Sequence, residues 1–484
     1  MLNKEYRIPF SQFNGLYDIV VKKDHKLRRI LELIDFNFVY DELKNKYCHD
    51  NGRMAKDPVM MFKYLFLKTF YGLSDRCLVE RCMTDMACKF FLGLNPEDEV
   101  IAPTTLTKFR RQRLQDVDII DVLLKRSVQV AKDHNLIDGS TIIVDSTHSL
   151  SKSNPVPPVK MLQRLSANLR KVVYNIDETY TQKMPQKYEG NELEKEMEYI
   201  DKLVSLLTSD EKLMLHDEIL EKIDFVRETV EDIKDHYTTS LDKDARIGHK
   251  SVDTEFFGYK THIAITPDRL IVAATVTSGE KNDGKELPTL IEKTKEKLPE
   301  LKRVIGDGAY AGNTNLEIAN EQGIEIIAKV NTLLIEGTQI ERQGFTYNKD
   351  AEMMVCPAGH MAKSKAVLRA KRSENDRMRY TFSRTFCKSC KLKEKCNAKG
   401  VVKRYCHPIQ KPSQLKQLEF MKTEEFKRWS KERYKIEAKN SELKHQYGYN
   451  KADYYGIYSM KLQGAVALFT SNMSRILRLM DEKA

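Results

Sequence analysis

Few features of membrane, secreted or fibrous proteins occur in this chain. Its 484 residues include one Trp, 14 Pro and 21 Gly, too little Pro and Gly for a collagen-like or low-complexity protein. No stretch approaches the roughly 18 uncharged apolar residues that a membrane-spanning helix needs. The first ten residues carry charges where a secretory signal has its apolar segment, so we expect a cytoplasmic protein with no membrane partner.

The chain is long and rich in charge. Hydrophobic residues make up 41% and charged residues 31%, and at roughly 150 residues per domain the length predicts about three globular domains. The net charge is +11, but residues 356–444 alone hold 25 Lys and Arg against 9 Asp and Glu. Such a segment attracts a polyanion, because neutralised phosphates release their counterions. On charge alone, a solvated basic face is an equally good interpretation.

The first quarter of the chain has the periodicity of helices. Apolar residues recur at helical spacing over residues 57–94, and Gly72 and Ser74 break this run into two predicted helices. A further helix begins at Pro103, because Pro is favoured in the first turn. Its last two turns carry the cations Lys108, Arg110, Arg111 and Arg113. This basic helix either enters a DNA groove or is simply exposed, and we give the two interpretations equal weight.

The middle of the chain predicts a mixed α/β sheet. A short β-branched apolar run at residues 141–147 is typical of a buried strand, and residues 256–265 and 270–276 predict a hairpin. Two further strands follow, around residues 303–310 and 324–330, each after a predicted helix. Charged amphipathic helices separate the first strand from the hairpin, and a cysteine-bearing segment follows the last strand.

Two carboxylates stand where predicted buried strands end. Asp145 and Asp307 occupy these positions, and the crevice beyond a sheet edge is a usual place for an active site. Each aspartate alone is better explained as the cap of a loop or helix, but two on one sheet weaken that explanation. Gly306 and Gly308 flank Asp307 and permit a close approach by a large ligand.

A third carboxylate lies on a predicted C-terminal helix. Arg433, Glu437 and Lys444 stand at i, i+4 and i+11 and therefore share one helical face. A cation, an acid and a second cation in one stripe suit a phosphodiester beside a metal-binding carboxylate. A solvated salt-bridge face is the alternative, and Glu442, on nearly the opposite face, is a competing acid.

The order of these motifs carries a family resemblance. The chain resembles bacterial insertion-sequence DDE transposases, which have an RNase H-like catalytic core. The matching blocks are Tyr71–Arg76, Pro103–Arg110, Ile143–Thr147, Asp244–Arg246 with Gly248–Lys250, Phe257–His262, Gly306–Tyr310 and Arg433–Glu437. The resemblance implies that Asp145, Asp307 and Glu437 bind the catalytic metal, and that Arg433 and Lys444 hold transposon-end DNA. Ser430 stands where the family usually has a Tyr that contacts phosphate.

This resemblance completes the predicted organisation. The predicted parts are a helical DNA-binding domain (1–132), an RNase H-like α/β core (133–154 and 241–333), a helical insertion (155–240), a cysteine-rich basic insertion (334–409) and a C-terminal helical part of the core (410–484). We expect a bacterial, nucleoid-associated enzyme that uses Mg²⁺ or Mn²⁺ to cleave transposon ends and join their 3′-hydroxyls to target DNA, as a homodimer on paired ends. The alternatives are an inactive transposase-derived DNA-binding regulator and a stand-alone RNase H-like nuclease.

Four cysteines form a second constellation. Cys356, Cys387, Cys390 and Cys396 include one CxxC pair, and thiolates in a cytoplasmic protein suit a closed tetrahedral zinc site better than disulfides. We therefore expect a structural Zn²⁺ in a ribbon-like insertion. The wide first gap and the absence of a second CxxC keep free thiols as the alternative.

Overall fold

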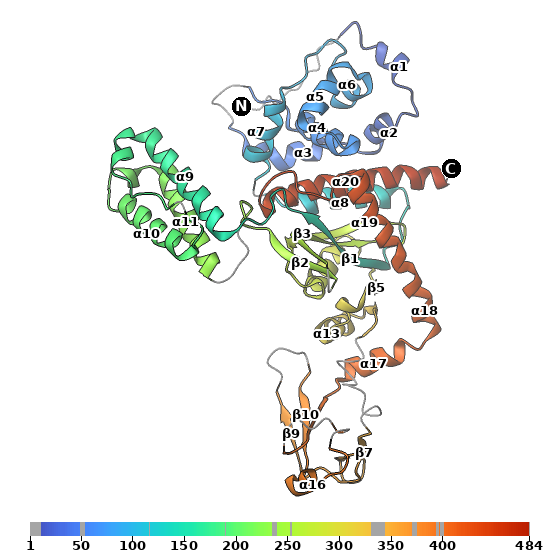
Figure 1. Ribbon diagram of the computed structural model, residues 1–484. Helices are drawn as coiled ribbons and strands as arrows, with labels where there is room; N and C mark the ends of the chain where they lie inside the picture. The colour runs from blue at the N-terminus through green and yellow to red at the C-terminus, as the bar shows by residue number, and fades with distance from the viewer. Residues whose placement is uncertain are drawn as a thin grey trace.

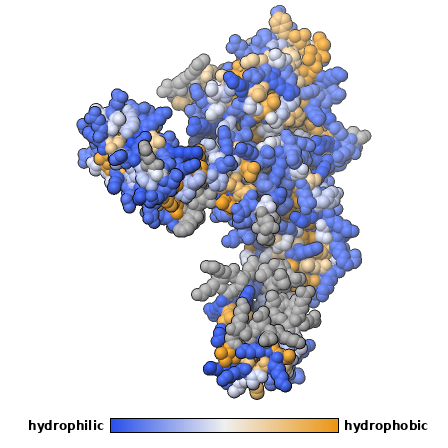
Figure 2. Space-filling model, viewed as in Figure 1, coloured by the Kyte–Doolittle hydropathy of each residue, from blue (hydrophilic) through white to orange (hydrophobic). Residues whose placement is uncertain are grey.

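The computed structural model describes residues 11–48, 54–115, 117–188, 190–234, 240–251, 254–330, 344–369, 375–393, 396 and 401–483. Figure 1 shows a helical N-terminal region above a central α/β core, with a helical arm to one side and a strand-rich arm below. Hydrophilic side chains cover most of the visible face (Figure 2). In the part of the chain that the structure describes, no helix is long and apolar enough to cross a membrane.

Local capping explains the helices of the N-terminal region. The Asp57 side chain accepts hydrogen bonds from two backbone N–H groups at the start of α4, and Gly72, with φ +62°, ends that helix. Two helices rather than one follow Gly72, because Asp85 ends α5 and its side chain caps α6. The helices are α1 (Leu16–Val20), α2 (Lys26–Leu33), α3 (Asn37–Leu43), α4 (Pro58–Tyr71), α5 (Asp75–Thr84), α6 (Met86–Leu92), α7 (Pro103–Arg113) and α8 (Ile119–Asp133).

A six-stranded mixed sheet forms the centre of the molecule. Its strands are β1 (Thr141–Leu150), β2 (Arg246–Ser251), β3 (Thr254–Ile265), β4 (Ile271–Ser278), β5 (Arg303–Ile305) and β6 (Glu325–Ile327). The order is β2-β3-β1-β5-β6, and β4 pairs with the second half of β3 as the predicted hairpin. β1 runs antiparallel to β3 and parallel to β5. This topology confirms the predicted RNase H-like core.

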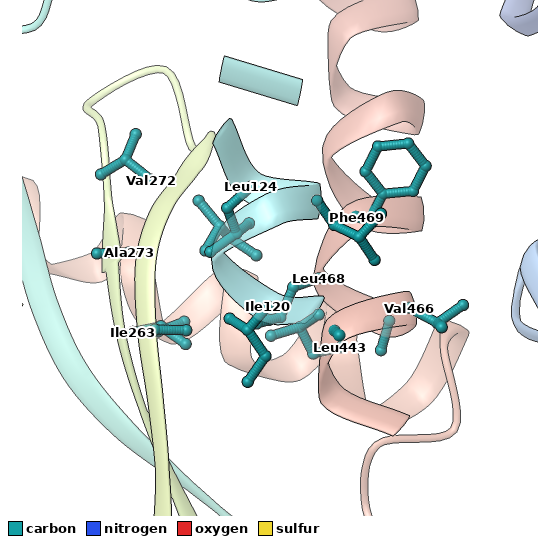
Figure 3. Packing of buried hydrophobic residues seen from close by; sticks show 14 of the residues in the cluster. Ile120, Leu124, Ile263, Val272, Ala273, Leu443, Val466, Leu468 and Phe469 are labelled. Carbon is teal, nitrogen blue, oxygen red and sulfur yellow. The ribbon is translucent and has the colours of Figure 1, made fainter. Parts of the chain in front are cut away.

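One continuous hydrophobic core joins the sheet to the N-terminal helices. The long C-terminal helix α20 (Ile457–Lys483) packs beside α8, and both lie against β4 (Figure 3). Leu124 and Leu468 are fully buried in this layer. Phe469 contacts the N-terminal region instead, with its ring 6.3 Å from that of Phe36 and 6.0 Å from that of Phe66. α20 therefore packs against both the central sheet and the N-terminal region. Two further helices pack on the sheet: α12 (Leu287–Lys295) contacts β4, and α13 (Asn313–Glu321) contacts β6.

The two arms have hydrophobic cores of their own. The helical arm consists of α9 (Pro158–Ile176), α10 (Leu193–Thr208) and α11 (Asp217–Lys234). The strand-rich arm consists of β7 (Thr346–Asn348), β8 (Met353–Val355), β9 (Ser364–Leu368), β10 (Arg377–Thr381), α16 (Arg384–Lys388) and β11 (Arg404–Pro408). The chain returns to the sheet through α17 (Pro412–Phe420), α18 (Glu424–Ser430) and α19 (Tyr434–Gln446), and α19 packs on β1.

Candidate active site

The sheet places Asp145 and Asp307 at equivalent levels of neighbouring parallel strands. Ile143 of β1 pairs with Ile305 of β5, and each aspartate lies two residues further along its own strand direction. Neighbouring strands lie about 4.8 Å apart, so the two carboxylates lie at one level of the sheet. Asp307 follows the end of β5 as predicted, whereas the prediction that Asp145 ends its strand is wrong, because β1 continues to Leu150 by pairing with β3. One oxygen of Asp307 also accepts a 2.9 Å hydrogen bond from the backbone N–H of Ala309. Asp307 therefore caps a turn, as the alternative interpretation predicted, and its charge also acts on Asp145.

The surroundings of Asp145 disfavour its charged form, mainly because the carboxylate is buried. The pKa of Asp145 is raised to about 6, mainly by burial and in smaller part by the carboxylates of Asp307 and Asp283. A backbone hydrogen bond from Ser146 and the positive charge of Arg433 act in the opposite direction. Clustered carboxylate oxygens are the ligands that hard divalent cations prefer, so the donor set fits Mg²⁺ or Mn²⁺.

One face of α19 lies along β1 beside these carboxylates. The Asn440 side-chain amide donates a 3.1 Å hydrogen bond to Asp145 Oδ2. One turn further on, Lys444 Nζ lies 3.3 Å from His148 Nδ1, three residues along the same strand. Two successive turns of α19 therefore follow β1, and this face includes the stripe predicted from the sequence.

Glu437 lies on this face, between two residues that act on Asp145. Arg433, one turn before it, lowers the pKa of Asp145, and Asn440, one turn after it, binds the Asp145 carboxylate. The Glu437 side chain is 59% exposed, and its Oε1 lies 3.6 Å from Arg433 Nη2. Its carboxylate is thus held by Arg433 at the rim of the site.

Glu442, the competing acid on this helix, already has a charged partner. It forms a 3.0 Å ion pair with the ammonium group of Lys439. Lys439 is fully buried and also donates to Ser471 of α20. Glu442 therefore neutralises a buried lysine.

The described residues contain no group of three or more His, Cys, Asp or Glu side chains already arranged to hold a metal ion.

Tyr310 is a site residue that the sequence reasoning did not single out. It is 1% exposed, and its hydroxyl has no hydrogen-bond partner among the described residues. Burial raises its pKa well above the usual value, and Asp145 and Asp307 are among the carboxylates that contribute. A Cβ atom at Gly306 would lie 2.8 Å from the Tyr310 ring, so Gly306 is needed for this packing. The only sequence signal was the position of Tyr310 in the block Gly306–Tyr310.

Asp283 was also missed. It follows β4, and its carboxylate accepts 2.9 Å hydrogen bonds from Ser146 Oγ and Lys260 Nζ. The fully buried His262 ring lies 3.8 Å from the same carboxylate. Asp283 therefore links β1 to β3 directly beside Asp145. No motif or spacing marked it, because these contacts form only when the strands pair.

Comparison with known families is consistent with this geometry. The family described as Transposase DDE domain matches residues 227–473, just over half of the chain. The chain belongs to the DDE transposases. A second family, Transposase domain (DUF772), matches residues 16–112, and no curated protein matches the chain. Asp307 and Glu437 of this transposase lie within the DDE match, whereas Asp145 lies between the two matches.

The predicted DNA-contacting cations of α7 differ in their environments. Lys108 and Arg111 of the transposase are exposed. Arg110 is buried, and its guanidinium binds the Asp75 carboxylate through both terminal nitrogens and the Tyr454 hydroxyl at 2.6 Å. Arg110 thus ties α7 to α5 and to the segment before α20, and it has no free face for DNA.

Two other predicted contacts are also engaged within the transposase. The guanidinium of Arg113 lies 4.3 Å from the centre of the Tyr47 ring. The Ser430 hydroxyl donates a 3.0 Å hydrogen bond to the backbone oxygen of Lys427 in its own helix. Ser430 therefore offers no hydroxyl donor to a phosphate in this conformation.

The four predicted zinc ligands lie together in the strand-rich arm. Cys356, Cys387, Cys390 and Cys396 line one small cavity, and all four are free thiols. Burial raises the pKa of Cys396, and although Lys403 opposes this shift, the other three thiols add to it. The four cysteines are thus neighbours. Among the residues that the structure describes, however, no group of three or more His, Cys, Asp or Glu side chains is arranged to hold a metal ion.

Proposed function

We propose that this transposase binds the terminal inverted repeats of a mobile element, cleaves DNA at its ends and transfers the 3′-hydroxyl ends to target DNA. The observation that carries the proposal is the placement of Asp145 and Asp307 on adjacent parallel strands, with the Arg433–Lys444 face of α19 beside them. Carboxylates at one level of a sheet beside a phosphate-binding stripe suit phosphoryl transfer.

Asp145, Asp307 and Glu437 would hold Mg²⁺ or Mn²⁺. The metal, when bound, would favour deprotonation of the attacking water or 3′-hydroxyl and stabilise charge on the transferred phosphate. Asn440 orients the Asp145 carboxylate by its hydrogen bond. The charge of Arg433 acts on Asp145, and its guanidinium would bind the phosphate bidentately, which would release Glu437.

Lys444, Lys108 and Arg111 complete the proposed DNA contacts. Lys444 lies on the stripe next to His148 and would bind the strand beyond the cleaved phosphate. Lys108 and Arg111 are exposed on α7 and would bind the repeat. Arg110 supports this helix through Asp75 and would act only indirectly.

The cysteines and the oligomeric state belong to the same proposal. Cys356, Cys387, Cys390 and Cys396 would hold one structural Zn²⁺, supported by their common cavity. The transposase would act as a homodimer on paired ends.

The test uses purified full-length protein, Mg²⁺ and end-labelled DNA that carries the inverted repeats flanking the coding region. Asp307→Ala and Glu437→Gln should abolish cleavage, whereas Glu432→Gln, a half-buried acid paired with Lys435, should retain it. Cleavage that survives Asp307→Ala would refute the site. Strand-transfer products distinguish a transposase from a stand-alone nuclease, and binding without any cleavage would identify an inactive regulator.

A further inference from the structure

A cavity of about 590 Å³ lies between the N-terminal region and the start of α20, away from the carboxylates. Figure 1 shows α7 and the beginning of α20 close together at this place. We call it the tyrosine cavity. The lining residues used below are Lys68, Arg110, Arg111, Tyr454 and Tyr455. Its volume is in the range of sites that hold a small ligand or one nucleotide.

Two of the cations in its wall are already neutralised. Arg110 binds Asp75, and Lys68 lies 3.6 Å from Asp75 and also binds Asp453. The Arg110 guanidinium and the Lys68 ammonium group both lie near the face of the Tyr454 ring, at 4.8 and 5.6 Å from its centre. Tyr454 is therefore fixed and forms the floor of the cavity.

Two further cations at the cavity have no such partner. Arg111 lines the cavity, and Lys152, although not part of the lining, lies near two of its tyrosine rings. Both cations are exposed, and neither forms an ion pair with any residue in the described ranges. The Lys152 ammonium group lies 5.4 Å from the Tyr454 ring and 6.0 Å from the Tyr455 ring. Tyr455 itself is 47% exposed. An accessible aromatic ring next to unpaired cations is the combination that binds unpaired nucleotides.

Charge also defines the side from which a strand would approach. Tyr455 separates the tyrosine cavity from a second cavity, on the side of the helical arm. The second cavity is lined by five acidic side chains, among them Glu221, Glu228 and Asp244, and by only two lysines, Lys222 and Lys243. A polyanion is repelled there and favoured on the side of Arg111.

The cavity is connected to the carboxylate site by β1. The last residue of β1, Leu150, forms a β-bridge with Lys451, just before the tyrosines. Leu150 is five residues from Asp145, a span of about 17 Å along a strand. Lys444 lies between the two sites. Burial lowers the pKa of Lys444, and the neighbouring charge of Lys250 also lowers it. Lys444 and Lys250 therefore both place positive charge near His148, in the part of β1 between Asp145 and Leu150.

We propose that the tyrosine cavity binds an unpaired nucleotide of the DNA end, with the base stacked on Tyr455 and its phosphate held by Arg111 and Lys152. This inference rests on the proposed function, because it supposes that the ligand is the DNA on which the transposase acts. It adds a binding site for single-stranded DNA beyond the end of β1, which lies five residues from Asp145.

The test measures binding of a fluorescein-labelled 12-nucleotide oligothymidylate to the full-length protein in EDTA, by fluorescence anisotropy. Tyr455→Ala should weaken binding about 5- to 150-fold, which corresponds to the ~1–3 kcal/mol of one stacked base. Tyr455→Phe should bind like the wild type, because it keeps the ring. Tyr347→Ala is the matched control, since Tyr347 is 48% exposed in the strand-rich arm.

Two further measurements make the result specific. Arg111→Ala should reduce the slope of log affinity against log salt by about 0.7, the value for one phosphate of a single strand. Binding of a blunt 12-base-pair duplex should change less than about twofold in Tyr455→Ala. Equal loss of duplex and single-strand binding, or unchanged single-strand binding by Tyr455→Ala, would overturn the inference. Because EDTA prevents cleavage, this outcome is independent of the Asp307→Ala test of the proposed function.

Discussion

Replacing Asp145 with Asn tests whether the carboxylate cluster opposes folding when no metal is bound. Burial, with Asp307 and Asp283, raises the pKa of Asp145 from 3.8 to about 6. The folded protein therefore holds this proton more tightly than the unfolded chain does. Protonation of Asp145 therefore stabilises the folded protein. This contribution is fully present below pH 3.8 and is lost as the pH rises through about 6.

The size of the effect follows from the two pKa values. The difference between 3.8 and about 6 corresponds to roughly 3 kcal/mol of unfolding free energy at pH 7.5. Asp145→Asn removes the charge but keeps an oxygen that can accept the hydrogen bond from Asn440. The variant should therefore be up to ~3 kcal/mol more stable than the wild type at pH 7.5, and nearly equal to it at pH 3.5.

Urea unfolding in EDTA, followed by circular dichroism at several pH values, measures this difference. Adding Mg²⁺ at pH 7.5 should then stabilise the wild type and leave Asp145→Asn unchanged, because a ligand stabilises only the state that binds it. A variant that is no more stable than the wild type at pH 7.5 would refute the reasoning about the cluster. Glu432→Gln is the control for loss of a carboxylate outside it.

Three other substitutions test the surroundings of the site. Asn440→Ala removes the donor to Asp145 and should weaken Mn²⁺ binding about 10- to 100-fold by equilibrium dialysis, while unchanged affinity would contradict its orienting role. Arg110→Met leaves the Asp75 carboxylate without its main partner and should destabilise the protein by ~3–5 kcal/mol in urea, whereas Arg111→Met should cost less than ~0.5 kcal/mol. Cys390→Ser should reduce the zinc content of the purified protein measured by atomic absorption, and an equal content would exclude this thiol as a ligand.

The sheet and its two aspartates could be predicted because their signals are local. The apolar run before Asp145 consists of the fully buried residues Ile142–Val144 of β1, and the run before Asp307 includes the buried residues Val304 and Ile305 of β5. Parallel pairing of these strands then fixes the two carboxylates at one level. The stripe on α19 was equally local, since Glu437 and Lys444 follow from helical spacing alone.

The remaining site residues depend on contacts that no spacing encodes. Asn440 is on the α19 stripe at i+7 from Arg433, but its importance comes from the approach of α19 to β1. Asp283 reaches Ser146 from a turn 137 residues away in sequence. Arg110 belonged to a basic helix in the sequence, and only the packing of α5 on α7 brings Asp75 to it. The pattern of charges in the sequence thus predicted that α7 carries a basic surface, but it could not show that Arg110 is buried.

The pairing of Arg433 with Glu437 predicts that DNA and metal bind with positive coupling. Without DNA, the Arg433 cation lies 3.6 Å from the Glu437 carboxylate and lowers the pKa of Asp145, so it repels a divalent cation from both acids. A phosphate that binds Arg433 would neutralise this charge and free Glu437, and metal would in turn strengthen DNA binding by the same factor. The Mn²⁺ affinity of the wild type should therefore rise about 5- to 100-fold when end DNA is added. In Arg433→Ala, Mn²⁺ should bind more tightly than to the wild type without DNA, and the increase with DNA should shrink. Equal enhancement by DNA in both proteins would show that Arg433 does not control access to the third carboxylate.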